Sequence, residues 1–205
     1  MEKRTEIITS ILKTLFPDPH IELEYSTPWE LFVAVVLSAQ TTDKKVNEVT
    51  KKLFKKYKTI KDYKNVSLSE FEKDIKSIGL YRNKSKNIIA SAKIVDKVYK
   101  GKVPDSMREL LKLPGVGRKT ANILLSNIYK KAEGIAVDTH VARLSKLFGL
   151  TANKDPNKIE KDLMKIIPQK EWLDFNHMMV LYGRRYCTAF CKHTDCPLRE
   201  FISSF

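Results

Sequence analysis

The sequence predicts an all-α protein, and three observations lead to that fold class. Apolar residues recur at helical spacing from one end of the chain to the other, and no run of alternating polarity is bounded by hairpin turns. Helix-start signals are frequent. The 205 residues include 42% hydrophobic and 30% charged side chains and only 7 glycines, a composition that is typical of folded chains and excludes a disordered or fibrous one.

Capping signals mark many of the expected helix starts. Three pairs have the capping-box spacing, in which a hydroxyl and a carboxylate can satisfy free amides of the first turn: Thr27 with Glu30, Ser67 with Glu70, and Ser106 with Glu109. Pro28 and Pro156 stand at first-turn positions, where a missing N–H does no harm. We therefore expect helices near residues 2–16, 28–39, 43–57, 68–77, 83–100, 107–112, 117–130, 139–148, 156–167 and 171–186. The helix at 28–39 is apolar on almost every side, so it should be central and buried.

Basic residues outnumber acidic ones, 38 to 24, which gives a formal net charge of +14. Such an excess favours a polyanionic partner, with nucleic acid ahead of an acidic membrane surface. The plain alternative is that lysines simply cover solvated helix faces. The longest apolar run, Leu31 to Leu37, is far short of the roughly 20 residues that span a bilayer, so we expect no membrane partner.

The N-terminus and the cysteines both indicate an intracellular protein. The first residues carry acids and lack an apolar core, so they do not form a signal peptide. All 3 cysteines lie between Cys187 and Cys196, which suits a thiol or metal cluster better than a disulfide framework.

The most informative segment is residues 113–121, which read L-P-G-V-G-R-K-T-A. We expect Pro114 to end a short helix, and Gly115 and Gly117 to permit a tight turn before the next helix begins. In this helix-hairpin-helix, backbone amides can approach a phosphate at the positive end of the second helix. The alternative is an ordinary turn between helices, but the basic, all-helical chain and the Arg118-Lys119 pair favour phosphate binding.

Lys119 adds chemistry to this hairpin. In the first turn of a helix, with Arg118 beside it, an ammonium group is disfavoured, so its pKa should fall. A neutral amine can attack the sugar carbon that holds a base, displace the base and leave a Schiff base, whose β-elimination cuts the strand. The alternative is a surface lysine that only contacts phosphate.

Asp138 is the matching candidate, nineteen residues after Lys119. It lies between an apolar stretch and an amphipathic helix, which is a good N-cap position, and Gly149 can end that helix. A carboxylate there can also stabilise positive charge on a sugar as the bond to the base breaks. Helix capping alone remains the alternative.

At these residues the sequence resembles the helix-hairpin-helix glycosylases, and specifically the endonuclease III family. The similarity covers nearly the whole chain through four ordered motifs, at residues 38–43, 78–84, the hairpin and 137–140. It implies a six-helix barrel at residues 22–132, a second domain formed by residues 1–21 and 133–205, and an active site in the cleft between them. It also implies base-excision repair, with Lys119 as the nucleophile and Asp138 as the essential acid. Because relatives that remove adenine opposite oxidised guanine generally lack the lysine, oxidised pyrimidines are the expected lesions.

The resemblance further implies which residues contact damaged double-stranded DNA. Gln40 and Leu80 match the family positions that enter the duplex where the damaged nucleotide has been flipped out. Taken alone, both would be ordinary helix-end residues. The other expected DNA-binding residues are Leu113, Gly115, Val116, Gly117, Thr120 and His140. We expect a monomer in the cytoplasm, associated with the nucleoid.

The C-terminal cysteines depart from the family pattern, in which Cys-x6-Cys-x2-Cys-x5-Cys holds a four-iron cluster. Cys187 and Cys196 match the first and third positions, but the second falls on His193, the fourth falls on Ile202, and Cys191 is out of register. We therefore expect no metal and no cofactor. The alternatives are a zinc ion held by Cys187, Cys191, His193 and Cys196, or an atypical iron–sulfur cluster on three cysteines.

Three functions remain in competition. The first is a bifunctional glycosylase with AP-lyase (β-elimination) activity on oxidised pyrimidines. The second is a non-catalytic helix-hairpin-helix protein that binds bent or damaged DNA. The third is a monofunctional glycosylase, in which Asp138 activates water and Lys119 only binds. The combination of Lys119 and Asp138 favours the first.

Overall fold

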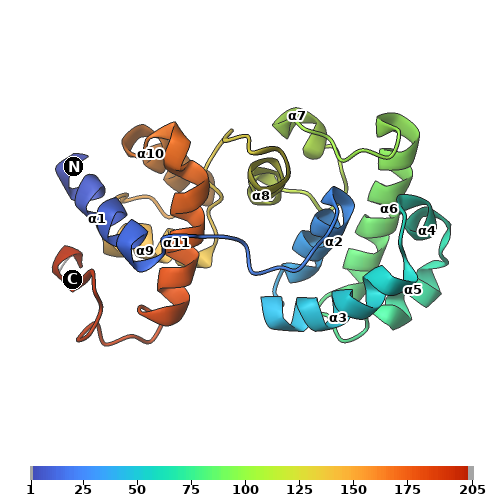
Figure 1. The fold of residues 1–205 in the computed structure, drawn as a ribbon, viewed down its shortest axis with the longest axis horizontal. Coiled ribbons are helices and arrows are strands. Elements are labelled where there is room, and N and C mark those ends of the chain that lie inside the picture. The colour runs from blue at the N-terminus through green and yellow to red at the C-terminus, as the bar shows by residue number, and fades with distance from the viewer. Residues whose placement is uncertain (1, 203–205) are drawn as a thin grey trace. The chain divides into compact units, whose positions relative to one another are not determined.

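The structure is a computed structural model that describes residues 2–202, and these residues form helices and connecting loops with no strand among them (Figure 1). The predicted all-α class is therefore confirmed. The helices are α1 (Glu2–Leu15), α2 (Pro28–Ser38), α3 (Asp43–Lys56), α4 (Ile60–Asn65), α5 (Leu68–Asp74), α6 (Tyr81–Tyr99), α7 (Met107–Leu110), α8 (Arg118–Tyr129), α9 (Thr139–Leu147), α10 (Pro156–Ile166) and α11 (Trp172–Arg185). Two short 3-10 segments, η1 (Gln169–Glu171) and η2 (Arg199–Phe201), flank α11 and precede the C-terminus.

The chain divides into two compact units. One consists of Glu22–Lys130, and the other joins the residues up to Ile21 with those from Lys131 onward. We call them the hairpin unit, which contains α2 to α8, and the terminal unit, which contains α1 and α9 to α11. The sequence-based borders were residues 22 and 132.

The predicted capping boxes form only in part. The hydroxyl groups of Thr27, Ser67 and Ser106 accept the expected amide bonds, from Glu30, Glu70 and Glu109 respectively. Two of the carboxylates serve other groups, because Glu30 accepts the Ser26 N–H at 2.6 Å and Glu109 pairs with Lys112 at 2.7 Å. The helix starts are therefore confirmed, but the carboxylates of Glu30 and Glu109 do not accept the N-cap amides as the spacing suggested.

A complete capping box occurs at α4, a helix that the sequence analysis missed. The Thr59 hydroxyl accepts the Asp62 amide, and the Asp62 carboxylate accepts the Thr59 amide at 2.7 Å. Six residues are too few to show a helical period, so the pattern gave no signal. The helix is held instead by Tyr63, whose ring is buried against Trp29, Tyr57 and Phe71.

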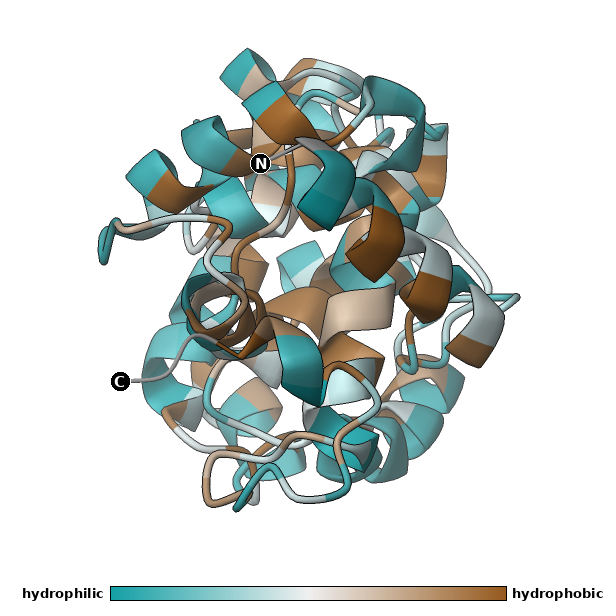
Figure 2. Ribbon diagram, turned by 90° about the vertical axis from the view of Figure 1, so that its left-hand side faces the viewer, coloured by the Kyte–Doolittle hydropathy of each residue, from teal (hydrophilic) through white to brown (hydrophobic). Residues whose placement is uncertain are grey.

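The core of the hairpin unit is built around α2. Its residues from Leu31 to Leu37 are all buried, and α2 packs against α3, α6 and α8, which confirms the expected central helix. Figure 2 shows apolar (brown) and polar (teal) residues alternating along the helices, as expected of helices that bury one face. No helix among the described residues combines the length and the apolar character that crossing a membrane requires.

The core of the terminal unit is formed by α1, α9, α10 and α11. Buried side chains from these helices meet in one cluster, which includes Ile8, Leu144, Leu163, Phe175 and Tyr182. Arg4 on α1 adds a polar tie, because its guanidinium donates to the carbonyl oxygens of Phe148 and Phe201. The first helix thereby holds both the end of α9 and the segment that follows the cysteines.

Candidate functional site

The turn between α7 and α8 is fixed by its own backbone and by the core. The Leu113 amide donates to Leu110 O at 3.0 Å, and the Val116 amide donates to Leu113 O at 3.1 Å. The side chains of Leu113 and Val116 are buried, and the Ser91 hydroxyl on α6 donates to Pro114 O at 3.1 Å. Two of the amides expected to meet phosphate, those of Leu113 and Val116, are thus already used inside the turn.

The two glycines of this turn have different requirements. Gly115 adopts φ +81°, and a Cβ there would lie 2.8 Å from Nδ2 of Asn87, so both conformation and space call for glycine. Gly117 has φ −95°, which any residue can adopt, and a Cβ there would meet no atom within 4 Å. Nothing inside the protein requires glycine at position 117, so an external contact is the remaining reason for it.

Lys119 lies in the first turn of α8 with its side chain exposed. The N-cap residue Gly117 makes no side-chain cap, and the first amides of a helix have no partner within the helix. The amides of Lys119 and Thr120 therefore belong to the positive end of a helix that no capping side chain neutralises. An anion is the natural partner of this helix end.

Gln40 and Leu80 are both held in the left-handed region, with φ 54° and φ 58°. Both are exposed, and Leu80 is 55% accessible. Their loops are neighbours, because a Cβ on Gly79 would lie 3.4 Å from Gln40 O. Left-handed backbone is strained for residues other than glycine, and such strain persists only where surrounding structure enforces it.

Lys84 enforces this arrangement, and the sequence analysis did not single it out. Its side chain is buried, and its ammonium group donates to Leu37 O at 2.7 Å, to Ala39 O at 2.5 Å and to Thr41 Oγ1 at 3.2 Å. Burial lowers the pKa of Lys84 to about 8. The backbone N–H of Lys84 donates to Leu80 O, so one residue ties the Gln40 loop to the start of α6.

In the terminal unit, Asp138 is the N-cap of α9. Its Oδ1 accepts the Val141 amide at 2.8 Å, so the cap uses one of the two carboxylate oxygens. The preceding residues, 135–137, are buried, and Asn176 on α11 donates to Ala136 O at 2.6 Å. The strand-like approach to Asp138 is thus anchored, and the carboxylate is held at a rigid helix start.

His140 lies in the first turn of α9, close to α11. A Cβ on Gly183 would lie 2.5 Å from Nδ1 of His140, so the imidazole occupies the space that a side chain at position 183 would need. The glycine in α11 therefore allows the histidine its position.

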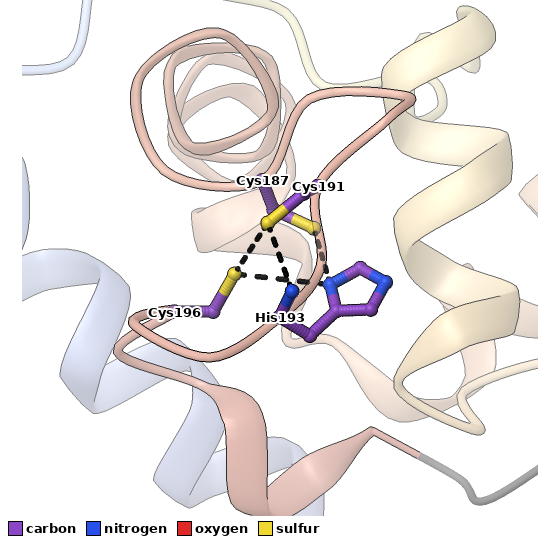
Figure 3. Close-up of side chains that lie close together, drawn as sticks. All are labelled: Cys187, Cys191, His193 and Cys196. Carbon is purple, nitrogen blue, oxygen red and sulfur yellow. Dashed lines mark hydrogen bonds between the residues drawn. The ribbon is translucent and has the colours of Figure 1, made fainter.

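The cysteine segment overturns the expectation of a chain without metal or cofactor. The sulfur atoms of Cys187, Cys191 and Cys196 and a ring nitrogen of His193 all lie within 4.8 Å of one another. In Figure 3 these four side chains turn toward a common point from the end of α11 and the loop that follows it. The prediction of no metal was wrong because it treated Cys191 as out of register, whereas the chain folds back and brings it into the group. We call residues 187–198 the ligand loop.

Two side chains that the sequence analysis left without a role anchor this loop. Arg143 on α9 donates to Cys187 O at 2.5 Å and lies 3.6 Å from its sulfur. Tyr182 on α11 is fully buried, and its hydroxyl accepts the Leu198 amide at 3.0 Å. Such partners are found only when distant parts of the chain are brought together, so no local pattern announced them.

The candidate residues thus fall into two sets. The hairpin unit brings together the hairpin with Lys119 and the paired loops of Gln40 and Leu80. The terminal unit brings together Asp138, His140 and the ligand loop.

Comparison with known proteins gives a consistent result. Residues 33–169 match the family model of the HhH-GPD superfamily base excision DNA repair protein. The chain is 48% identical over 198 residues to endonuclease III of Bacillus subtilis (strain 168), covering 96% of this chain and 90% of the relative. It is 45% identical over 188 residues to endonuclease III of Synechocystis sp. (strain ATCC 27184 / PCC 6803 / Kazusa), covering 92% and 85%.

Solved structures agree with these relatives. A trapped endonuclease III–DNA covalent intermediate matches with a TM-score of 0.94 at 46% identity, over 98% of this chain and 95% of the other. A non-covalent endonuclease III–DNA complex matches equally well. A thermostable thymine-DNA glycosylase matches with a TM-score of 0.86 at 23% identity, over 98% and 96%, which shows the shared fold.

Proposed function

The chain belongs to the HhH-GPD superfamily of base excision DNA repair proteins and to its endonuclease III members, and from this premise we propose that Lys119 and Asp138 carry its chemistry. The protein is a bifunctional base-excision DNA glycosylase and lyase.

Lys119 is the proposed nucleophile. Its amine attacks the sugar carbon that holds the damaged base, the bond from carbon to base breaks, and the base leaves with the electron pair and takes up a proton. The sugar ring opens to a Schiff base on Lys119. Loss of a proton from the adjacent carbon then expels the 3′ phosphate by β-elimination and cuts the strand. The observation that carries this proposal is an exposed lysine in the uncapped first turn of α8, where a phosphate can bind beside it.

Asp138 is the proposed carboxylate partner. The cap occupies Oδ1, and Oδ2 remains as a proton acceptor for the reaction. The same charge stabilises the positive sugar as the base departs. His140, Gln40, Leu80 and the amides at Gly115, Gly117 and Thr120 are the proposed DNA contacts.

The proposed contribution of Leu113 and Val116 is different from that of the glycines. Because their side chains are buried and their amides donate within the turn, they shape the hairpin rather than donate to phosphate. We further propose oxidised pyrimidines as the lesions, a monomer as the working form and the nucleoid as its place of action.

Borohydride trapping tests the nucleophile. Wild-type protein, Lys119→Ala and Lys119→Gln are incubated with a duplex that carries one oxidised pyrimidine, and the Schiff base is reduced to a stable adduct. We expect an adduct with wild type and none with either variant, while Lys119→Gln still binds the duplex because the amides of α8 remain. Lys112→Gln is the matched control, since Lys112 lies on the same hairpin and its exposed pair with Glu109 contributes little to stability.

The outcomes separate the competing functions. Base release without an adduct would identify a monofunctional glycosylase, in which Asp138 activates water. Binding without base release on oxidised pyrimidines, oxidised guanine or mispaired adenine would contradict the enzymatic proposal. An adduct that persists in Lys119→Ala would place the nucleophile on another lysine.

A further inference from the structure

The ligand loop has the geometry of a site for one metal ion. The Cys187 sulfur lies 3.5 Å from Nδ1 of His193, the Cys196 sulfur lies 3.8 Å from the same nitrogen, and the sulfur atoms of Cys191 and Cys196 are 3.1 Å apart. The widest separation within the group is 4.8 Å. Around one tetrahedral zinc ion, with bonds of about 2.3 Å to sulfur and about 2.0 Å to nitrogen, neighbouring ligand atoms stand roughly 3.5 to 3.8 Å apart.

A four-iron cluster fits this geometry poorly. In such a cluster each ligand binds a different iron at the corner of a cube, so the ligand atoms stand farther apart than around one ion. The position that carries the fourth cysteine in the family is Ile202, whose apolar side chain packs against the core of the terminal unit. The fourth ligand here is Cys191, only a few residues after Cys187, and it closes a small site instead of a wide one.

We propose that Cys187, Cys191, His193 and Cys196 bind a single Zn²⁺ ion that organises the ligand loop, in place of a four-iron cluster. Three thiolates and one imidazole are a common ligand set of structural zinc sites, and the short spacing Cys-x3-Cys-x-His-x2-Cys lets one loop wrap one ion. Four protein ligands leave no open position, so the role of the ion is structural. This inference does not rest on the chemistry proposed for Lys119.

The surroundings of the site support a bound cation with thiolate ligands. Three thiolates and Zn²⁺ leave one negative charge, and the Arg143 guanidinium lies 3.6 Å from the Cys187 sulfur. The His193 amide donates to the Cys191 sulfur at 3.3 Å, a contact that orients this sulfur within the group. His193 also has φ 63°, a left-handed conformation that needs a local cause, and ligation of its ring supplies one.

Metal analysis of the wild-type protein tests the proposal. The protein is produced in cells supplied with both iron and zinc, purified without oxygen, and measured by elemental analysis and visible absorption. We expect about one zinc per chain, negligible iron and no visible absorption. Replacement of the zinc by Co²⁺ should give the intense colour of a tetrahedral, thiolate-ligated ion.

Variants show which residues hold the ion. Cys191→Ser should weaken zinc binding by at least about 100-fold, measured by competition with a chelator. His193→Cys should retain zinc, because four thiolates also form a zinc site. Thr194→Ala is the matched control in the same loop, since its exposed hydroxyl contacts Asp195 and no ligand atom.

Several results would overturn the proposal. Iron near four per chain with broad visible absorption would identify a cluster, and one iron without zinc would identify a different ion. Protein without metal under these conditions would show that the four side chains are not a site. If Cys191→Ser fails to fold, the zinc content and the Co²⁺ spectrum of the wild type still decide.

Discussion

The hairpin turn at residues 111–117 and the ligand loop at residues 187–198 are both short segments without regular structure, but they are held by opposite means. Inside the hairpin turn, backbone amides donate to backbone carbonyls, and Leu113 and Val116 fill the core. In the ligand loop, side chains meet one another, and Phe190 is 97% exposed. Backbone hydrogen bonds and buried side chains therefore fix the first segment, whereas the meeting of four side chains fixes the second.

This difference has a practical consequence for function. A segment that is fixed by its own backbone can present a reactive group without help from a ligand. A segment that is fixed by converging side chains depends on what those side chains bind. The hairpin should thus tolerate loss of the metal, and the ligand loop should not.

Replacement of Asp138 should give the largest effect, a loss of base release. At this helix start the capping role and the chemical role of the carboxylate can be tested separately. Asparagine caps helices as well as aspartate does, so Asp138→Asn should keep the bond to the Val141 amide and remove only the charge. We expect base release to slow by about 10²- to 10⁴-fold, measured in single-turnover reactions. Asp138→Ala should lose the same activity and about 1 kcal/mol of stability as well. Full activity in Asp138→Asn would reduce this residue to a helix cap.

Removal of the metal should give the next largest effect, a faster amide hydrogen exchange in the ligand loop. With a strong chelator, amide hydrogen exchange in residues 188–198 should accelerate by at least about 100-fold, because the bonds to the ion no longer restrain the loop. Exchange at the hairpin should change by less than about 2-fold. Equal acceleration in both segments would show that the ligand loop supports the whole molecule, the hairpin included.

The same contrast explains how much was predictable from sequence. The central position of α2, the start of α9 at Asp138 and the hairpin turn follow from periodicity, caps and glycines that act within a few residues. The role of Lys84 was not predictable from local pattern. Its three oxygen partners come from residues 37–41, which are separated from it in the sequence by the whole of α3, α4 and α5. The four ligand residues were named only as an alternative to the expectation of no metal, because register along the family's cysteine pattern does not describe how the loop brings Cys191 toward Cys196.

Replacing the two hairpin glycines should give smaller effects, which separate the conformational role of Gly115 from the external contact expected at Gly117. Gly115→Ala should lower the free energy of unfolding by about 1 to 2 kcal/mol, because alanine resists φ +81° and its Cβ meets Asn87. Gly117→Ala should lower the free energy of unfolding by about 0.5 to 1 kcal/mol, since alanine is a poorer N-cap than glycine but its Cβ crowds no atom. If phosphate approaches the amide of Gly117, this variant should still bind duplex DNA about tenfold more weakly. Unchanged affinity in a titration at fixed salt would remove phosphate from that position.

The smallest expected effect is the pH dependence of stability that the buried ammonium group of Lys84 causes. The pKa of its amine is about 8 in the folded protein and near 10.5 in the unfolded chain. Below about pH 8 both states hold the proton, so burial of the charge opposes folding to its full extent. Between these values the unfolded chain binds more protons, and stability therefore rises with pH, by about 1 kcal/mol at pH 9. Lys84→Met lacks this titration, so the difference between wild type and variant in urea unfolding should shift toward wild type from pH 7 to pH 9 by that amount. The other lysines titrate equally in both proteins, so their contributions cancel in the difference between the two free energies of unfolding. If that difference does not change with pH, the three oxygens stabilise the buried ammonium as well as water does, and the pKa of Lys84 is not lowered.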